Sequence, residues 1–353
     1  MSGPRRPRPG AFALIAAVAG ALVAVVLGFL TFGAQATSAP DRVPVAVSAP
    51  PAGPLQAVAS RVSQQGGGQL EWRLTTPEDG RKALADKEVY GVLELGAGPS
   101  ATVVVSGAVN PSGTQVAQQA LTGAAQALSA AAAQADPAAP PVAVKVETLN
   151  PVSVAGRTAP LAASALAWVG CLVAGAVLLL GSRRLGLVPG VGARVVQVLG
   201  AGVLITAVIA GFLKLWDSSL PLGWDVLGFL FLAATAFAAL QAGLLRLLGV
   251  RAMSILGPLY LVAPAVAGQV PELLNPAYRA LLWSWTPFRF SAEGLRSLLQ
   301  GTPGAPDVAA GIWVLAGMLV VGLVVVVWPG RRASAVEETE AHTPDRVVEV
   351  GVH

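Results

Sequence analysis

Six apolar segments of the chain are each close to the roughly 20 residues that a helix needs to cross a lipid bilayer. They cover residues 11–33, 160–181, 195–215, 223–248, 252–270 and 308–328. Hydrophobic residues make up 54% of the 353 residues and charged residues 12%, whereas a soluble globular protein carries about 25% charged residues. Lipid offers the backbone no hydrogen-bond partner, so such segments must be helices. The sequence therefore predicts a polytopic α-helical membrane protein with six spans.

Arginines beside these segments predict the orientation of the chain. If six spans alternate, all of these arginines fall on one side, and loops rich in Lys and Arg stay in the cytoplasm. We therefore expect a multi-pass protein of the plasma membrane with both termini cytoplasmic: a short segment at 1–10 and a disordered tail at 329–353. The arginines are Arg5, Arg6, Arg8, Arg183, Arg184, Arg194, Arg246, Arg251, Arg331 and Arg332. Because these arginines lie beside the apolar segments, the net charge of +4 indicates membrane topology. It suggests membrane lipid as a partner and no nucleic acid.

The first apolar segment has two interpretations. Ala34-Gln35-Ala36 resembles the A-x-A site at which a secretory signal is cleaved. However, the segment spans about 23 residues, whereas the apolar core of a signal peptide has about 7–15, so we favour a retained membrane anchor. Small residues recur at every fourth position and form one face suited to close packing on another helix: Gly20, Ala24 and Gly28.

The connection at residues 271–307 lies outside the cytoplasm by this count, yet it carries arginines. It also carries Trp and Phe side chains, and tryptophan is enriched at the membrane–water interface. We interpret it as one or two short helices in or near the outer interface, starting at Asn275-Pro276 and Thr286-Pro287, with an ordinary loop as the alternative. Its arginines and aromatic residues are Arg279, Trp283, Trp285, Phe288, Arg289, Phe290 and Arg296.

The fifth apolar segment contains Pro258 and Pro264. A proline inside a helix removes a backbone donor and clashes with the preceding turn. We therefore expect the helix to be broken there, as is tolerated in a membrane where neighbouring helices or a water-lined cavity satisfy the freed groups. Such a break would mark a pathway, although purely structural helices contain prolines as well.

Residues 34–159 have the composition of a folded α/β domain, which the topology places outside the cytoplasm between spans one and two. Alternating valines at 43–47 and 142–146 predict strands with one buried face, and further strands are expected at 70–74, 89–95 and 102–105. Thr76-Pro77 and Asn110-Pro111 predict helix starts. The expected order is βαβαββαβ, with the alanine-rich stretch up to Gln134 as a helix or a partly ordered spacer.

The sequence lacks the residues of several kinds of active site. Both histidines, His342 and His353, lie in the C-terminal tail, and Cys171 is the single cysteine. We therefore expect no metal site built from His and Cys, no Ser-His or Cys-His nucleophile, no cofactor and no enzymatic activity. No G-x-x-x-x-G-K-[ST] phosphate loop is present. Without an ATP site or ionisable groups in the middle of a span, uphill transport needs energy from a partner.

The layout of one span, a large outside domain and five further spans resembles the permease subunits of type-two ABC exporters and the related phage-infection-protein-like (Pip) membrane proteins. Three stretches look like segments of that family: RKALADKEVYGVLEL at 81–95, VVVSGAVNP at 103–111, and TPFRF at 286–290 leading to Gly294-Leu295-Arg296. The resemblance implies a permease that forms a homo- or heterodimer and is driven by a separate ATPase. It makes Arg183, Arg184 and Arg194 candidate contacts of that ATPase, with topology alone as the alternative.

Two functions follow from these observations. The first is a permease-like exporter subunit for an amphipathic or lipid-like compound, which is favoured by the layout and the uncharged spans. The second is a non-transporting scaffold or receptor of the cell envelope whose outside domain binds a partner.

Overall fold

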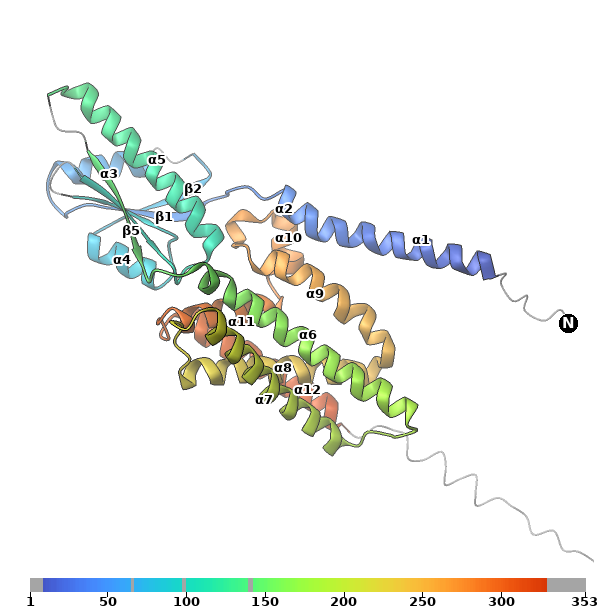
Figure 1. Cartoon of the computed structure of the whole chain (residues 1–353). Coiled ribbons are helices and arrows are strands. Elements are labelled where there is room, and N and C mark those ends of the chain that lie inside the picture. The colour runs from blue at the N-terminus through green and yellow to red at the C-terminus, as the bar shows by residue number, and fades with distance from the viewer. Residues whose placement is uncertain (1–8, 65–66, 97–99, 139–141, 329–353) are drawn as a thin grey trace, which may run out of the picture.

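The computed structural model describes residues 9–64, 67–96, 100–138 and 142–328. The chain is mainly helical, with one small mixed sheet (Figure 1). The expectations for residues 1–8 and for the tail at 329–353 lie outside the described residues. The described helices and strands run from α1, which begins at Pro9, to α12, which ends at Val327.

The sheet domain, defined as the elements from β1 to β5, has five strands in the order β2-β1-β3-β4-β5. β1 pairs in parallel with β2 and β3, β3 runs antiparallel to β4, and β4 pairs in parallel with β5. The order of elements along the chain is βαβαββαβ, as the sequence predicts. The elements are β1 Val43–Ser48, α3 Pro54–Gln64, β2 Leu70–Thr75, α4 Pro77–Ala85, β3 Val92–Leu95, β4 Ser100–Ser106, α5 Pro111–Ala135 and β5 Ala143–Leu149.

Helices cover both faces of this sheet (Figure 1). On one face, α3 and α5 bury residues such as Ala59 and Leu121 against Val45 and Val103. On the other face, α4 buries Leu84 among residues of the central strands. Alternate residues of a strand point to opposite faces, so Val45 and Val47 of β1 enter the first core and Ala46 between them enters the second.

The helix starts of the sheet domain follow local hydrogen bonding. The Thr76 hydroxyl accepts from the backbone N–H of Asp79 at 3.2 Å, and the Asn110 side chain accepts from the N–H of Ser112 at 3.0 Å. Each caps N–H groups that have no partner within the helix, and the following proline needs no such partner. The alanine-rich stretch is helical over its whole length, from Pro111 to Ala135.

Among the described residues, five helical segments are long and apolar enough to cross a membrane. They are Ala17–Ala36, Val154–Arg184, Val191–Trp216, Trp224–Ala267 and Pro306–Val327. The fourth has 44 residues, which at 1.5 Å per residue is about 66 Å and twice the thickness of a hydrocarbon core. These segments suggest a membrane protein.

The 44-residue segment consists of two helices, α8 Trp224–Leu248 and α9 Met253–Ala267, with the 3₁₀ segment η2 Gly249–Ala252 between them. Gly249 has φ of +59°, a conformation that costs little for glycine and much for other residues. The expected interruption at Pro258 and Pro264 is absent, because α9 continues through both positions. The chain breaks instead at Gly249.

The long helices form an up-and-down bundle with two distinct ends. At the sheet end lie the start of α6 (Val154–Arg184) and the end of α7 (Val191–Trp216), where Ser153 hydrogen-bonds Asp217. The remote end joins the end of α6 to the break after α8, since Arg183 lies beside Gly249. There α8 also meets the end of α12 (Pro306–Val327), because Nη1 of Arg246 donates to the carbonyl of Val325 at 2.8 Å.

The core of the bundle is built around three aromatic side chains. Trp168 of α6, Phe237 of α8 and Phe288 of α11 (Pro287–Leu299) are fully buried, with ring centroids 5.1 to 5.7 Å apart. Aromatic pairs at such distances add about 0.5–1.5 kcal/mol beyond the area that they bury. Nε2 of Gln241 donates to the carbonyl of Trp168 at 3.1 Å. The short helix α11 is therefore part of the bundle interior.

The N-terminal helix α1 (Pro9–Gly28) stands apart (Figure 1). It continues through the π-helical turn η1 Phe29–Gly33 and α2 Ala34–Ala36. The C-terminal part, from Leu27 onward, packs on the bundle, where Ala34 is buried with Val262 and Val266. A Cβ atom added at Gly20 or Gly28 would have no neighbour within 4 Å. The small-residue face is therefore unoccupied among the described residues.

Close approach of α8 and α12 gives a first prediction. A Cβ atom on Gly322 would lie 2.5 Å from the backbone carbon of Ala239, whereas one on Gly317 of the same helix would have no neighbour within 4 Å. Replacing Gly322 by Ala forces two backbones apart, and overpacking of this kind costs about 1–3 kcal/mol. We expect Gly322→Ala to lower the thermal unfolding midpoint of the detergent-solubilised protein. Gly317→Ala should leave it unchanged or raise it, and equal effects would contradict this packing.

Candidate functional site

The sheet domain contacts the bundle through one stretch of chain, from the end of α9 to the start of α12. This stretch contains η3 Pro271–Leu273, α10 Pro276–Tyr278, the π-helical turn η4 Arg279–Trp283 and helix α11. We call its contacts with the sheet domain the joint. It coincides with the segment at 271–307 for which the sequence predicts short helices.

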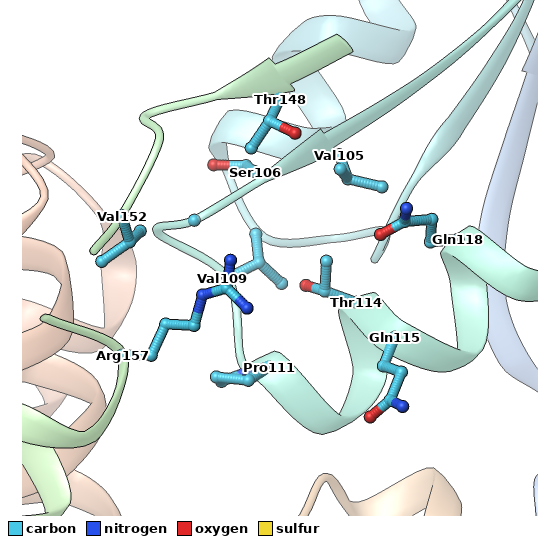
Figure 2. Close-up of a pocket in the computed structure, with 11 residues that line it drawn as sticks. Val105, Ser106, Val109, Pro111, Thr114, Gln115, Gln118, Thr148, Val152 and Arg157 are labelled. Carbon is cyan, nitrogen blue, oxygen red and sulfur yellow. The ribbon is translucent and has the colours of Figure 1, made fainter. Parts of the chain in front are cut away.

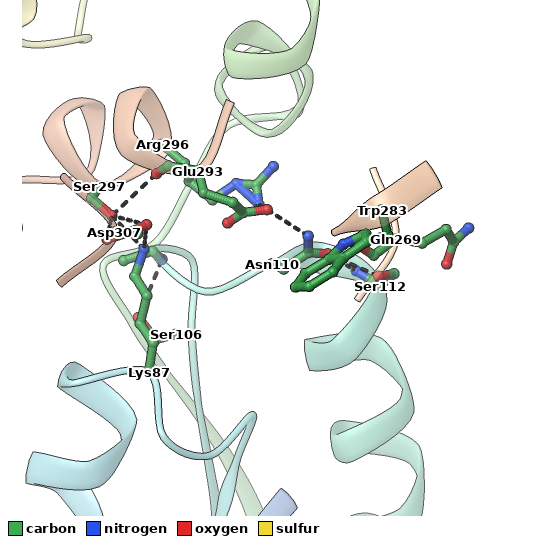
Figure 3. Close-up of polar contacts among 11 residues, drawn as sticks. Lys87, Ser106, Asn110, Ser112, Gln269, Trp283, Glu293, Arg296, Ser297 and Asp307 are labelled. Carbon is green, nitrogen blue, oxygen red and sulfur yellow. Dashed lines mark hydrogen bonds and ion pairs between the residues drawn. The ribbon is translucent and has the colours of Figure 1, made fainter. Parts of the chain in front are cut away.

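Lys87 forms the innermost contact of the joint (Figure 3). Its Nζ lies 2.5 Å from Oδ2 of Asp307 and also donates to the Ser297 hydroxyl. The Lys87 side chain is only 13% exposed and that of Asp307 only 20%. Lys87 follows α4 with φ of +61°, and this turn directs its side chain toward the bundle. Asp307 lies in the first turn of α12, where the helix dipole favours a negative charge.

A second contact joins the start of α5 to α11. Nδ2 of Asn110 donates to Oε1 of Glu293 at 2.7 Å while its Oδ1 caps α5, so one side chain serves both functions. Glu293 in turn lies 3.4 Å from Nη1 of Arg296, whose side chain is 6% exposed. A guanidinium this buried needs a counter-ion nearby. Figure 3 shows these groups as a continuous polar row above the sheet.

Tyr90 forms a third contact, with its hydroxyl donating to Oε2 of Glu272 at 2.9 Å. Burial, together with the negative charge of Glu272, raises the pKa of Tyr90 above its ordinary range. The ring lies against the first turn of α5, where a Cβ on Gly113 would come within 2.4 Å of it. Tyr90 therefore remains a neutral donor and fixes the distance between α5 and η3.

Backbone hydrogen bonds complete the joint. The N–H groups of Ala39 and Asp41 donate to the carbonyls of Leu273 and Glu272 at 3.1 and 2.8 Å. On the other side of the domain, Nδ2 of Asn150 donates to the carbonyl of Gln300 at 3.0 Å. Apolar packing of Val43, Val270 and Leu273 fills the space between these contacts. The sheet domain is thus attached to one stretch of chain from several sides.

A cavity of about 370 Å³ lies beside the joint (Figure 2). It opens at the carboxyl ends of β4 and β5 and at the first turns of α5, and the side chain of Arg157, from the first turn of α6, extends into it. Thr114 contributes a buried hydroxyl for which the described residues offer no hydrogen-bond partner. Gln115 and Gln118 add amide groups from the same helix.

This cavity combines an arginine, a helix N-terminus and uncharged polar side chains. Its lining residues include no carboxylate, and both a guanidinium and a helix N-terminus attract negative charge. Its size falls in the range of small-molecule sites. The arrangement suits a small anionic or polar group approaching from outside the sheet. The described residues contain no cluster of three or more His, Cys, Asp or Glu able to hold a metal ion.

Some of the arginines and aromatic residues predicted to lie at the membrane interface contact one another. The guanidinium of Arg289 stacks on the ring of Trp283 at 3.8 Å from its centroid, and on Phe290 at 4.0 Å. The indole N–H of Trp283 donates to the carbonyl of Gln269 at 3.2 Å. Trp285 is 53% exposed and lies at the surface. Pro258 and Pro264 lie earlier in the chain than this group, within α9.

The candidate ATPase-contact residues lie at the remote end of the bundle. Arg183, at the end of α6, and Arg194, in the first turn of α7, line one cavity together with Arg246, whereas Arg184 does not line it. Arg183 and Arg184 are both exposed, and Arg194 is half-buried.

Sequence reasoning missed the residues that form the joint. Lys87, Tyr90 and Glu272 are single polar residues in turns, and Asp307 reads as an ordinary first-turn acid of a helix. Their partners lie about 180 to 220 positions away. The one available signal was the arginines of the 271–307 segment, which lie where the predicted topology expects few.

Comparison of the chain with protein-family models, with curated proteins and with solved structures finds no match.

The joint gives a second prediction. Lys87→Met leaves the carboxylate of Asp307 without its cation, and breaking a buried pair costs about 3 kcal/mol. Lys82→Met removes a lysine from the exposed pair with Asp86, where side chains are 74% and 44% exposed, and should cost much less because solvent screens that pair. Equilibrium unfolding in mixed micelles measures both. Equal costs for the two variants would contradict the assignment of Lys87 to the joint.

Proposed function

We propose that this protein is the permease-like membrane subunit of an exporter for an amphipathic or lipid-like compound, energised by a separate ATPase. The observation that carries the proposal is the joint. A folded domain outside the bundle is bonded to α11, and α11 also belongs to the bundle core. A change in the packing of the long helices therefore displaces the sheet domain, as a transporter that works on both sides of a membrane requires.

The proposal includes six spans rather than five, with α8 and α9 as separate spans. The break at Gly249 and the length of the combined segment support this division. With α1, α6, α7, α8, α9 and α12 as spans, the sheet domain lies outside the cytoplasm between the first and second. Arg183, Arg184, Arg194, Arg246 and Arg251 then face the cytoplasm, as positively charged loops prefer.

The spans offer a surface suited to apolar cargo. A cavity of about 330 Å³ lies between α6 and α7 near the sheet end, lined by Ala159, Leu166, Phe212 and other mainly apolar residues. Ionisable side chains buried in the middle of the spans, such as a proton-coupled transporter uses, do not occur among the described parts of the bundle. Energy therefore has to come from elsewhere, which is the reason for proposing an ATPase.

The same architecture suggests a dimer. Helix α1 has few contacts with the bundle, and its face of Gly20, Ala24 and Gly28 has nothing packed on it in the described structure. Helices in lipid associate through such small residues because their backbones can approach closely. In the proposed homo- or heterodimer, α1 packs on the partner subunit.

A second function is favoured by the cavity at Arg157. A polar cavity on the outside domain is what a non-transporting receptor or scaffold of the cell envelope needs in order to hold an anionic group of its partner. In this alternative the bundle serves as an anchor, and the joint holds the sheet domain in a fixed orientation above the membrane.

Cysteine labelling tests the topology. Cys171 is buried and gives little background, whereas Gln119 and Val188 are exposed. We expect a membrane-impermeant maleimide to label Gln119→Cys on intact cells, because α5 belongs to the outside domain. Val188→Cys, in the loop after α6, should react only after the cells are permeabilised. Labelling of Val188→Cys on intact cells, or protection of Gln119→Cys, would overturn the proposed orientation.

Affinity purification under gentle extraction tests the function. We expect the full-length protein to copurify with a nucleotide-hydrolysing ATPase, and Arg184→Glu to reduce the recovered ATPase several-fold by reversing a charge in the exposed cytoplasmic loop. Arg61→Glu, an equal charge reversal on exposed α3 of the sheet domain, is the matched control. A purified complex without any ATPase would contradict the exporter and leave the receptor as the better account.

A further inference from the structure

A second charged cavity lies at the remote end of the bundle, between α6, α7 and α8. Its volume is about 120 Å³, and its polar lining consists of Arg183, Arg194, Arg246 and Gln197. These residues come from the ends of α6 and α8 and from the first turns of α7. The cavity lies at the end opposite to the joint and is separate from the Arg157 cavity.

The charges in this cavity have one sign only. Arg246 is held by the end of α12, with Nη1 donating to the carbonyl of Val325 at 2.8 Å and to that of Val326. Ion pairs of the described residues include neither Arg183 nor Arg194. Three guanidinium groups around one small space repel one another, and a bound anion would remove that repulsion. The cavity is therefore suited to an anion.

Gln197 gives independent support. Both polar atoms of its amide are buried, and the described residues offer neither of them a hydrogen-bond partner. A buried polar atom without a partner costs about 1–3 kcal/mol, so the amide calls for a ligand. An oxygen acceptor in the cavity would take the Nε2 protons. Guanidinium and amide donors together match the oxygens of a phosphate group.

The surroundings decide which kind of phosphate fits. Leu178, Leu179 and Leu245 form the apolar wall of the cavity. The outer surface of the same helices is also apolar, with Val177 exposed by 66% and Val196 by 70%. An acyl chain can lie along this surface while its headgroup occupies the cavity. A free phosphate ion would gain nothing from these walls.

We propose that the cavity binds the phosphate of an anionic phospholipid headgroup, with Arg183, Arg194 and Gln197 as its ligands. Basic cavities between membrane helices are a known form of headgroup site. Arg246 contributes charge while its hydrogen bonds hold α12 in place. The bound lipid bridges α6, α7 and α8 at the end where their positive charges would otherwise push them apart. This site does not depend on export or on an ATPase.

The neighbouring arginine provides the control. Arg184 has the same charge and lies one residue from Arg183, but it does not line the cavity. Arg183→Gln, Arg194→Gln and Gln197→Leu each remove one ligand, whereas Arg184→Gln changes only the surface charge. Arg246→Gln is unsuitable because Arg246 also holds the end of α12.

The test uses the full-length protein in nanodiscs of phosphatidylcholine, with phosphatidylglycerol or inorganic phosphate added in separate arms and the thermal unfolding midpoint as the readout. We expect phosphatidylglycerol to raise the midpoint and inorganic phosphate at the same concentration to have no effect. Arg183→Gln and Arg194→Gln should each weaken the apparent affinity for phosphatidylglycerol about fivefold. Gln197→Leu should weaken it as well although it changes no charge, and Arg184→Gln should not.

Three results would overturn the proposal. Equal weakening by Arg184→Gln and Arg183→Gln would reduce the effect to general attraction between a basic surface and acidic lipid. An equal rise with inorganic phosphate would identify a free-anion site instead of a lipid site. No rise with phosphatidylglycerol, for a wild-type protein that unfolds cooperatively in phosphatidylcholine, would show that the cavity does not bind this anionic lipid. A single cooperative unfolding transition of each variant in phosphatidylcholine alone verifies that it folds.

Discussion

The placement of α11 is the constraint on which the rest of the structure depends. This helix buries Phe288 against Trp168 and Phe237 on one side and presents Glu293 and Ser297 to the sheet domain on the other. A helix with both faces covered cannot move without disturbing both neighbours. Packed interiors are dense and shift between discrete arrangements instead of deforming continuously. The sheet domain and the long helices are therefore mechanically one unit.

Charge is distributed to suit this arrangement. At the joint, Lys87 lies beside Asp307 and Arg296 beside Glu293. At the remote end of the bundle, Arg246 instead donates to backbone carbonyls, and Arg183 and Arg194 form no ion pair with the described residues. Between the two ends the buried polar contacts are neutral, for example the hydroxyls of Ser164 and Ser291, 2.8 Å apart. Neutral groups cost less to bury in an apolar bundle than charges, so the charged contacts lie at the two ends of the bundle.

The sequence was informative where structure is determined by neighbours along the chain. Alternating valines predicted the strands, and Thr76-Pro77 and Asn110-Pro111 predicted helices that begin there. It was less informative where distant residues decide, since Lys87 and Asp307 are 220 positions apart in the chain. Pro258 misled because a helix in a packed bundle can continue past a proline, whereas Gly249, with its positive φ, ends α8. Which of the two residues ends the helix, Gly249 or Pro258, cannot be decided without the tertiary packing.

The two ends of the bundle therefore differ in what can act on them. At the remote end, α6, α7 and α8 are accessible at the exposed Arg184 and at the helix ends around Gly249. At the sheet end, the Arg157 cavity is lined both by α5 and by the first turn of α6, so a ligand bound there contacts both helices. Helix α6 joins the two places directly, and its midpoint, Trp168, packs against α11. A displacement of α6 at either end would therefore act on the packing of this aromatic cluster, whether the protein exports a compound or reports the binding of one.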